Sequence, residues 1–150
     1  MEVTARNHQK KISLNLPQII KITTRVLKAQ GIKRASLALV FVTSQKITAM
    51  NKKYLHQSCS TDVIAFDVAD SHSKKDNFFT GDIVISTDAV IRNSCFFKTT
   101  RAYELVLYIV HGILHLLGFD DHRACDIKKM RAKEEKIMKF LGNIVNASIK

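Results

Sequence analysis

The chain has 150 residues, of which 46% are hydrophobic and one is proline. This length suits one domain, and the composition excludes an intrinsically disordered protein. Lys and Arg number 24 against 13 Asp and Glu, so the formal net charge is +11, which favours an anionic partner. Nucleic acid is the commonest such partner and a membrane surface is the rival, while the plain alternative is a soluble protein with lysine-rich helix faces.

Cysteine usage and hydropathy indicate a cytoplasmic protein. Cys59, Cys95 and Cys125 are odd in number, widely spaced and form no CxxC pair, which favours free thiols in a reducing compartment. Residues 1–11 contain no apolar stretch of the kind found in a signal peptide. The most apolar segment, residues 105–119, contains two histidines and is shorter than the roughly 20 residues that a membrane span needs. We therefore expect no association with the membrane.

Four segments have the composition of β-strands. They are residues 2–7, 35–43, 62–68 and 81–86. The second segment is nearly all apolar, with Leu37, Leu39 and Phe41 on one face and three more apolar residues on the other. This pattern is typical of a central strand that is covered on both sides. The polar residues 70–77 predict a loop.

Helical spacing of apolar residues predicts five helices. The first lies between Asn15, which can cap it, and Gly31, which can end it. The others are expected at residues 44–54, from Thr87 or Asp88 onward, at 100–117 and, as a basic amphipathic helix, at 126–141. Because strands and helices mix without strict alternation, we expect residues 1–150 to form one α+β domain. It should hold a small mixed sheet of about four strands packed on helices, like a zinc hydrolase.

Three histidines form the strongest candidate for a functional site. His111 and His115 are four residues apart on the expected helix, so their imidazoles lie on one face, one turn apart. Gly118 ends the helix, and the chain can then turn back so that His122 approaches the same point. Three neutral imidazoles leave one tetrahedral position open for water, as in catalytic rather than structural zinc sites. We therefore predict one Zn²⁺ per chain, bound by His111, His115 and His122, which act as the catalytic residues for hydrolysis.

The same histidines could instead have a purely structural role. Two histidines on an apolar helix can be core residues that bond to backbone groups, but a third histidine beyond a glycine turn favours a metal. The first two histidines and the glycine resemble the zinc-protease pattern H-E-x-x-H-x-x-G-x-x-H. Gly112 stands where a protease carries its glutamate base, which is against peptide hydrolysis.

Residues 111–122, HGILHLLGFDDH, resemble the signature of the YbeY family, H-G-x-L-H-L-x-G-[YF]-D-H. Two other stretches agree in order and spacing. Residues 51–54 (NKKY) and 60–66 (STDVIAF) resemble the family's N-x-x-Y-R and P-T-D-V-L-S-F, and residues 81–86 (GDIVIS) resemble its G-D-I strand. The histidine motif is specific, whereas the other two are informative only together. The resemblance covers residues 51–122.

The resemblance implies a metal-dependent, single-strand-specific endoribonuclease. It implies action in ribosomal RNA maturation, notably near the end of the small-subunit RNA, and in ribosome quality control. Ribosomal RNA and the small ribosomal subunit are the partners that it implies. An alternative is a ribosome-binding assembly factor whose metal is mainly structural, and another is a metal-dependent hydrolase of a different substrate.

Three departures from the family pattern bear on the site. Asp120 and Asp121 both precede His122, so in strict register Asp121 falls where the third ligand belongs, and a carboxylate can also bind zinc. We favour His122, because the turn after Gly118 can absorb one residue. Leu55 replaces the family's arginine, which weakens the case for RNA cleavage if that arginine holds phosphate.

Ser60 replaces the family's proline, which affects the stiffness of a loop. Asp62 is either an exposed residue at a strand edge or a group that orients a histidine.

Overall fold

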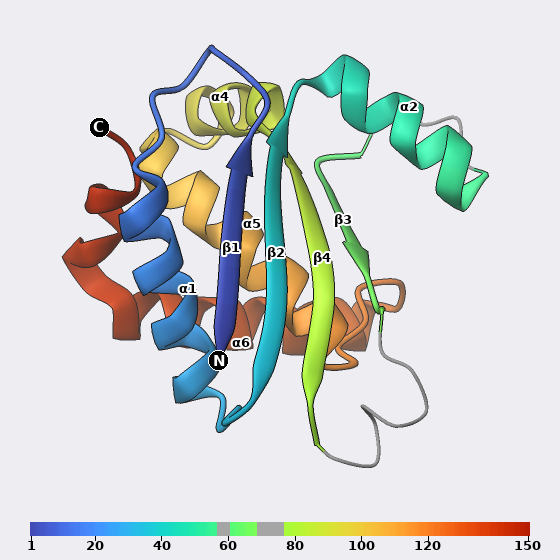
Figure 1. The fold of residues 1–150 in the computed structure, drawn as a ribbon, viewed down its shortest axis with the longest axis vertical. Coiled ribbons are helices and arrows are strands. Elements are labelled where there is room, and N and C mark those ends of the chain that lie inside the picture. Colours follow the sequence, from blue (N-terminus) through green and yellow to red (C-terminus); the bar gives the residue numbers. More distant parts are fainter. Residues whose placement is uncertain (57–60, 69–76) are drawn as a thin grey trace.

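The strands form one mixed sheet in the order β1-β2-β4-β3 (Figure 1). They are β1 (Glu2–Asn7), β2 (Ala35–Val42), β3 (Val63–Phe66) and β4 (Phe79–Ser86). β1 and β4 run parallel to the central β2, and β3 runs antiparallel to β4 at the edge. This computed structural model describes residues 1–56, 61–68 and 77–150. The expected α+β fold with a four-stranded mixed sheet is confirmed.

The described residues also form five α-helices and one 3-10 helix. They are α1 (Leu16–Ala29), α2 (Ser44–Leu55), α4 (Thr87–Phe96), α5 (Arg101–Leu116), α6 (Ala124–Leu141) and η1 (Gly142–Ser148). Side-chain caps explain where several helices begin. Asn15 accepts a hydrogen bond from the Gln18 N–H at the start of α1, and Thr100 accepts one from the Tyr103 N–H at the start of α5. No helix among the described residues is long and apolar enough to cross a membrane.

Three strands differ in length from the expectation, and β2 does so only by ending at Val42, one residue early. β4 begins at Phe79, two residues before the expected start at Gly81, because Phe79 and Thr80 pair with the first residues of β2. β3 covers Val63–Phe66 rather than residues 62–68. Most of the loop expected at 70–77, together with Cys59 and Ser60, lies outside the described residues. Cys95 and Cys125 are free and exposed.

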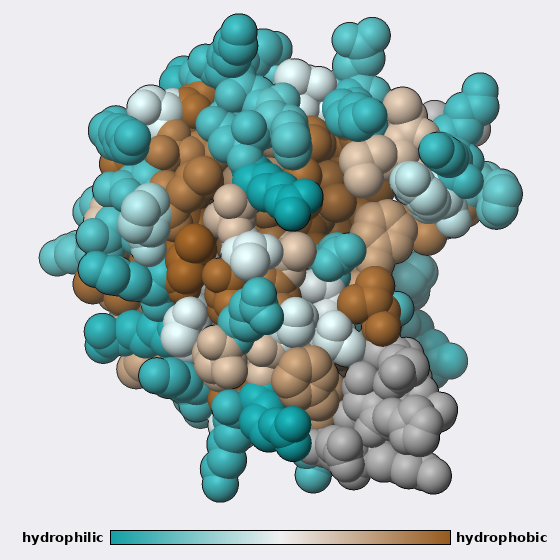
Figure 2. All heavy atoms as spheres, viewed as in Figure 1, coloured by the Kyte–Doolittle hydropathy of each residue, from teal (hydrophilic) through white to brown (hydrophobic). Residues whose placement is uncertain are grey.

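Successive side chains of β2 point to opposite faces of the sheet and belong to two separate hydrophobic clusters. Leu37, Leu39 and Phe41 are buried in the larger cluster, together with side chains of α1, α5 and α6. Val42 belongs to a smaller cluster with Ile47 of α2. Figure 1 shows α5 and α6 behind the sheet and α2 at its upper right. On the near face, hydrophilic side chains project around the rim while hydrophobic ones stay visible between them (Figure 2). The large core therefore anchors α5, the helix that carries two of the candidate ligands.

Gly112 allows α5 to lie close against β4. A Cβ atom at this position would lie 2.7 Å from Cγ2 of Ile83, which is fully buried. Gly112→Ala should therefore lower the free energy of unfolding by about 1–3 kcal/mol through overpacking, even though alanine is the better helix former. Denaturant unfolding measures the loss. The double variant with Ile83→Ala should lose less stability than the two single variants lose together. A loss equal to the sum of the two single losses would show that this contact is not the cause.

Candidate metal centre

Helix α5 places His111 and His115 on one side, one turn apart. The chain leaves the helix after Leu116, and Gly118 adopts a φ of 95°, a conformation that side-chain-bearing residues rarely take. The Phe119 N–H then donates to the Leu114 carbonyl at 3.0 Å, which closes the helix end. This turn brings the following loop back towards the two histidines, as the sequence predicts.

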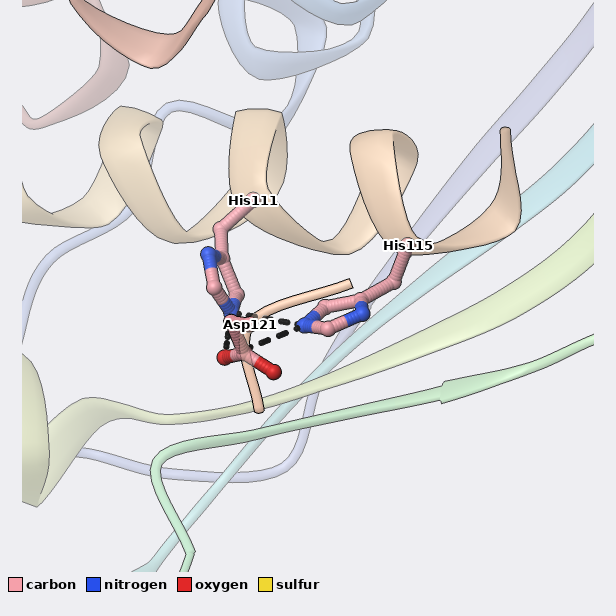
Figure 3. Close-up of side chains that lie close together, drawn as sticks. All are labelled: His111, His115 and Asp121. Carbon is pink, nitrogen blue, oxygen red and sulfur yellow. Dashed lines mark hydrogen bonds and ion pairs between the residues drawn. The ribbon is translucent and has the colours of Figure 1, made fainter. Parts of the chain in front are cut away.

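The two imidazoles and one carboxylate converge on a single point (Figure 3). The Nε2 atoms of His111 and His115 lie 2.9 Å apart, and Oδ2 of Asp121 lies 3.5 Å from each of them. All three residues are partly buried, and their ligand atoms form a group that could hold a metal ion. The structure therefore brings Asp121 beside the histidine pair.

His122 points elsewhere in this arrangement. Its side chain is 84% exposed, and its Nδ1 atom bonds to Asp120. The hydrogen bond that His122 donates to the Asp120 carboxylate raises the pKa of His122, and the same contact lowers the pKa of the Asp120 carboxyl. The structure thus unites two of the three expected ligands, His111 and His115, with Asp121 and leaves His122 next to them, at the surface.

Glu134 of α6 holds the far side of the His111 ring. Its Oε1 atom lies 2.6 Å from Nδ1 of His111, and its side chain is only 14% exposed. Because a carboxylate only accepts hydrogen bonds, Nδ1 carries the proton, and the lone pair of Nε2 faces His115 and Asp121. A carboxylate in this position is the usual companion of a metal-binding histidine.

The donor set fits a zinc ion. Ligand bonds of about 2.0–2.1 Å and tetrahedral angles place two ligand atoms roughly 3.3 Å apart, and the separations here are 2.9 Å and 3.5 Å. Two imidazoles and a carboxylate also suit zinc, and three protein ligands leave a position open for water. The residues present therefore match a catalytic site in number, chemistry and spacing.

Two pockets flank the three residues. The first, here called the Asp62 pocket, has a volume of about 530 Å³ and extends from His111 and Asp121 towards Asp62 and Tyr108. The second, here called the Leu55 pocket, has a volume of about 580 Å³ and extends from the same two residues towards Leu55. The position at which this sequence departs from the family arginine therefore lies in the wall of the candidate site.

Among the described residues, Asp62 bonds to no histidine. Its Oδ1 atom accepts from Arg92 at 2.9 Å, and its Oδ2 atom accepts from Asn93 at 3.2 Å and from the Tyr108 hydroxyl at 3.5 Å. Burial and the Asp62 charge raise the pKa of Tyr108, which keeps this hydroxyl protonated. Asp62 is therefore a partly exposed residue just before the edge strand β3, with its side chain 38% exposed and bonded to other side chains at one end of a pocket.

Sequence reasoning missed Glu134, although a signal was present. Met130, Ile137, Met138 and Leu141 are the buried residues of α6, and Glu134 lies on the same stripe, one turn after Met130. A carboxylate on the buried face of an otherwise basic amphipathic helix needs a partner. The pattern alone does not identify His111 as that partner.

The chain is similar to proteins of one named family. The family model for Endoribonuclease YbeY matches residues 4–142. Endoribonuclease YbeY from Geobacter metallireducens is 31% identical over 144 residues, which cover 94% of this chain and 96% of that protein. Endoribonuclease YbeY from Azobacteroides pseudotrichonymphae is 38% identical over 122 residues, covering 79% of this chain and 84% of that protein.

A solved structure has the same fold. The solution structure of TM1509 from Thermotoga maritima superposes with a TM-score of 0.60 at 19% identity, covering 96% of this chain and 95% of that one. Together with the family match over residues 4–142 and the sequence relatives, the resemblance first noted in residues 111–122 is confirmed. The chain belongs to the Endoribonuclease YbeY family.

Proposed function

We propose that this protein is a zinc-dependent endoribonuclease that cuts single-stranded RNA during ribosomal RNA maturation and ribosome quality control. The observation that carries the proposal is the convergence of His111, His115 and Asp121 where two pockets meet. The match to proteins named Endoribonuclease YbeY supports RNA as the substrate. The end of the small-subunit RNA, on the small ribosomal subunit in the cytoplasm, is the proposed place of action.

Each residue of the site has a separate task. His111 and His115 would hold one zinc ion through Nε2, and Glu134 would fix the tautomer and the orientation of His111. When bound, zinc supplies a positive charge that polarises a phosphoryl oxygen and lowers the pKa of water to about 7. The net charge of +11 would attract the phosphates of the substrate and hold them by counterion release.

The third ligand in this proposal is Asp121, and His122 is the alternative. Asp121 already lies 3.5 Å from both Nε2 atoms, whereas His122 must rotate inward from its contact with Asp120. Asp121→Ala should therefore weaken zinc binding more than His122→Ala does. Competition with a chromogenic chelator measures both affinities. The reverse ranking would assign the role to His122, as the sequence favours.

A second candidate is a ribosome assembly factor that binds the small subunit without cutting RNA. Leu55 favours it, because the residue is 43% exposed in the wall of the Leu55 pocket and offers no group for phosphate. If the protein is an enzyme, Leu55→Arg should raise the cleavage rate by about 10- to 150-fold, since one charged hydrogen bond contributes roughly 1.5–3 kcal/mol. Single-turnover kinetics measures this change. Tighter binding with no faster cleavage would favour the assembly factor.

The substrate is tested with a precursor of the small-subunit RNA that carries an extended end. Zinc-loaded protein should cut this RNA at unpaired positions near the mature end, both free and on the small subunit. A duplex of the same sequence should stay intact. If the zinc-loaded protein binds the subunit but cuts neither form of the RNA, the assembly-factor proposal replaces the enzyme.

A further inference from the structure

The two pockets adjoin at the candidate metal centre. Both are lined by Thr61, Val63, His111 and Asp121, so their shared wall includes two of the proposed zinc ligands. A chain that occupies both pockets would therefore pass the proposed ligands. Two adjoining pockets suit a linear polymer whose reacting bond lies between them, with one unit of the polymer on each side.

The Asp62 pocket has an apolar lining next to its polar groups. Leu107 of α5 and Ile127 of α6 are half-buried in its wall, and Met130 closes it with 2% exposure. These three aliphatic side chains offer a surface for a flat, weakly polar group. The volume of about 530 Å³ lies within the range of about 300–1,000 Å³ that is usual for ligand pockets.

The charges of this pocket suit a nucleoside with a phosphate at its mouth. The exposed Arg131 lies in the pocket wall and can meet a phosphate. The negative charge of Asp62 is balanced by Arg92 at 2.9 Å, and that of Glu134 is engaged by His111. A carboxylate has about four lone-pair sites, so Asp62 can still accept from a hydroxyl or an amino group.

We propose that the Asp62 pocket binds one nucleoside of the RNA, directly beside the phosphate that lies at the metal centre. The inference rests on the proposed function and adds a substrate subsite to it. A base reaches such a pocket only when it leaves the stack of its neighbours, which is easy in a single strand and costly in a duplex. The pocket thereby supplies a structural reason for a preference for unpaired RNA.

The subsite is tested first by binding alone. Methyl NMR spectra of the zinc-loaded protein are recorded with 5′-AMP, with its 2′-deoxy form and with inorganic phosphate. We expect 5′-AMP to shift the methyl signals of Leu107 and Ile127, and phosphate alone to leave them in place. A weaker shift with the deoxy form would show that the ribose hydroxyl is the group that Asp62 accepts from; an equal shift would assign that role to the base. Equal spectra with 5′-AMP and with phosphate would overturn the proposal.

The second test fills the pocket. Ile127→Trp should raise the KM for a single-stranded RNA by about tenfold or more. It should leave the zinc content unchanged, because Ile127 lines the pocket but offers no ligand atom. Ile144→Trp is the control, since Ile144 is also half-buried but lines neither pocket. Should the tryptophan variant fail to fold, the NMR result decides.

The inference and the proposed function fail in different ways. RNA cleavage that Ile127→Trp leaves unchanged, with unshifted Leu107 and Ile127 signals in 5′-AMP, would refute the subsite and keep the enzyme. Shifted signals in a protein that cuts no RNA would keep the subsite as a nucleotide-binding pocket and refute the enzyme.

Discussion

His115→Ala is expected to abolish RNA cleavage and to leave most of the RNA binding intact. The variant removes one of the two imidazoles that converge at 2.9 Å, so zinc should be lost. Metal ions contribute several kcal/mol of transition-state stabilisation, which corresponds to a rate loss of about a thousandfold or more. Binding should persist because lysines and arginines, not the metal, supply most of the affinity for phosphates.

The loss of cleavage and the retention of RNA binding are measured on one preparation. Filter binding at several salt concentrations gives the affinity, and single-turnover cleavage gives the rate. His8→Ala is the matched control, because His8 is exposed and lines neither of the two pockets. If wild type and His115→Ala cut RNA equally slowly in the presence of zinc, the histidine pair is not a catalytic centre and the assembly-factor reading takes its place.

Glu134→Gln is expected to weaken zinc binding by about 10- to 100-fold, which is the usual effect of losing the carboxylate behind a metal-binding histidine. The amide cannot hold the Nδ1–H of His111 as strongly as the carboxylate does at 2.6 Å, so the ring loses its fixed tautomer. Chelator competition gives the affinity, and the NMR signal of the His111 Nδ1 proton reports the hydrogen bond itself.

Glu135→Gln provides the control for this variant. Glu135 is the neighbouring residue on α6, but its side chain is 68% exposed and pairs with Lys139 at 3.1 Å. Both variants change the net charge equally, so a general electrostatic effect would weaken zinc binding to the same extent in each. Equal zinc affinities of the two variants would show that Glu134 does not support zinc binding.

Local patterns were sufficient to predict most of the fold. The alternation of Leu37, Leu39 and Phe41 placed them on the core face of β2, and the cap at Asn15 marked the start of α1. The early start of β4 was not predictable from its own residues, because Phe79 joins the strand only through its pairing with Ala35.

The site was predictable only where local spacing along the chain determines it. The spacing of His111 and His115 along a helix determines that their rings meet, and the structure shows them together. Whether Asp121 or His122 turns inward depends on the backbone path after Gly118, in which one residue more or less reverses the choice. Glu134 reaches His111 only through the packing of α6 against α5, which no local pattern specifies.

RNA cleavage should depend on one zinc ion held at His111, His115 and a residue of the following loop. The most direct measurement removes zinc with a chelator, washes the chelator away and titrates zinc back while the cleavage of purified ribosomal RNA is followed. We expect no cleavage by the stripped protein and a rate that rises linearly with added zinc and saturates at one zinc per chain. Full cleavage by the stripped protein, or a rate that does not respond to added zinc, would contradict this expectation.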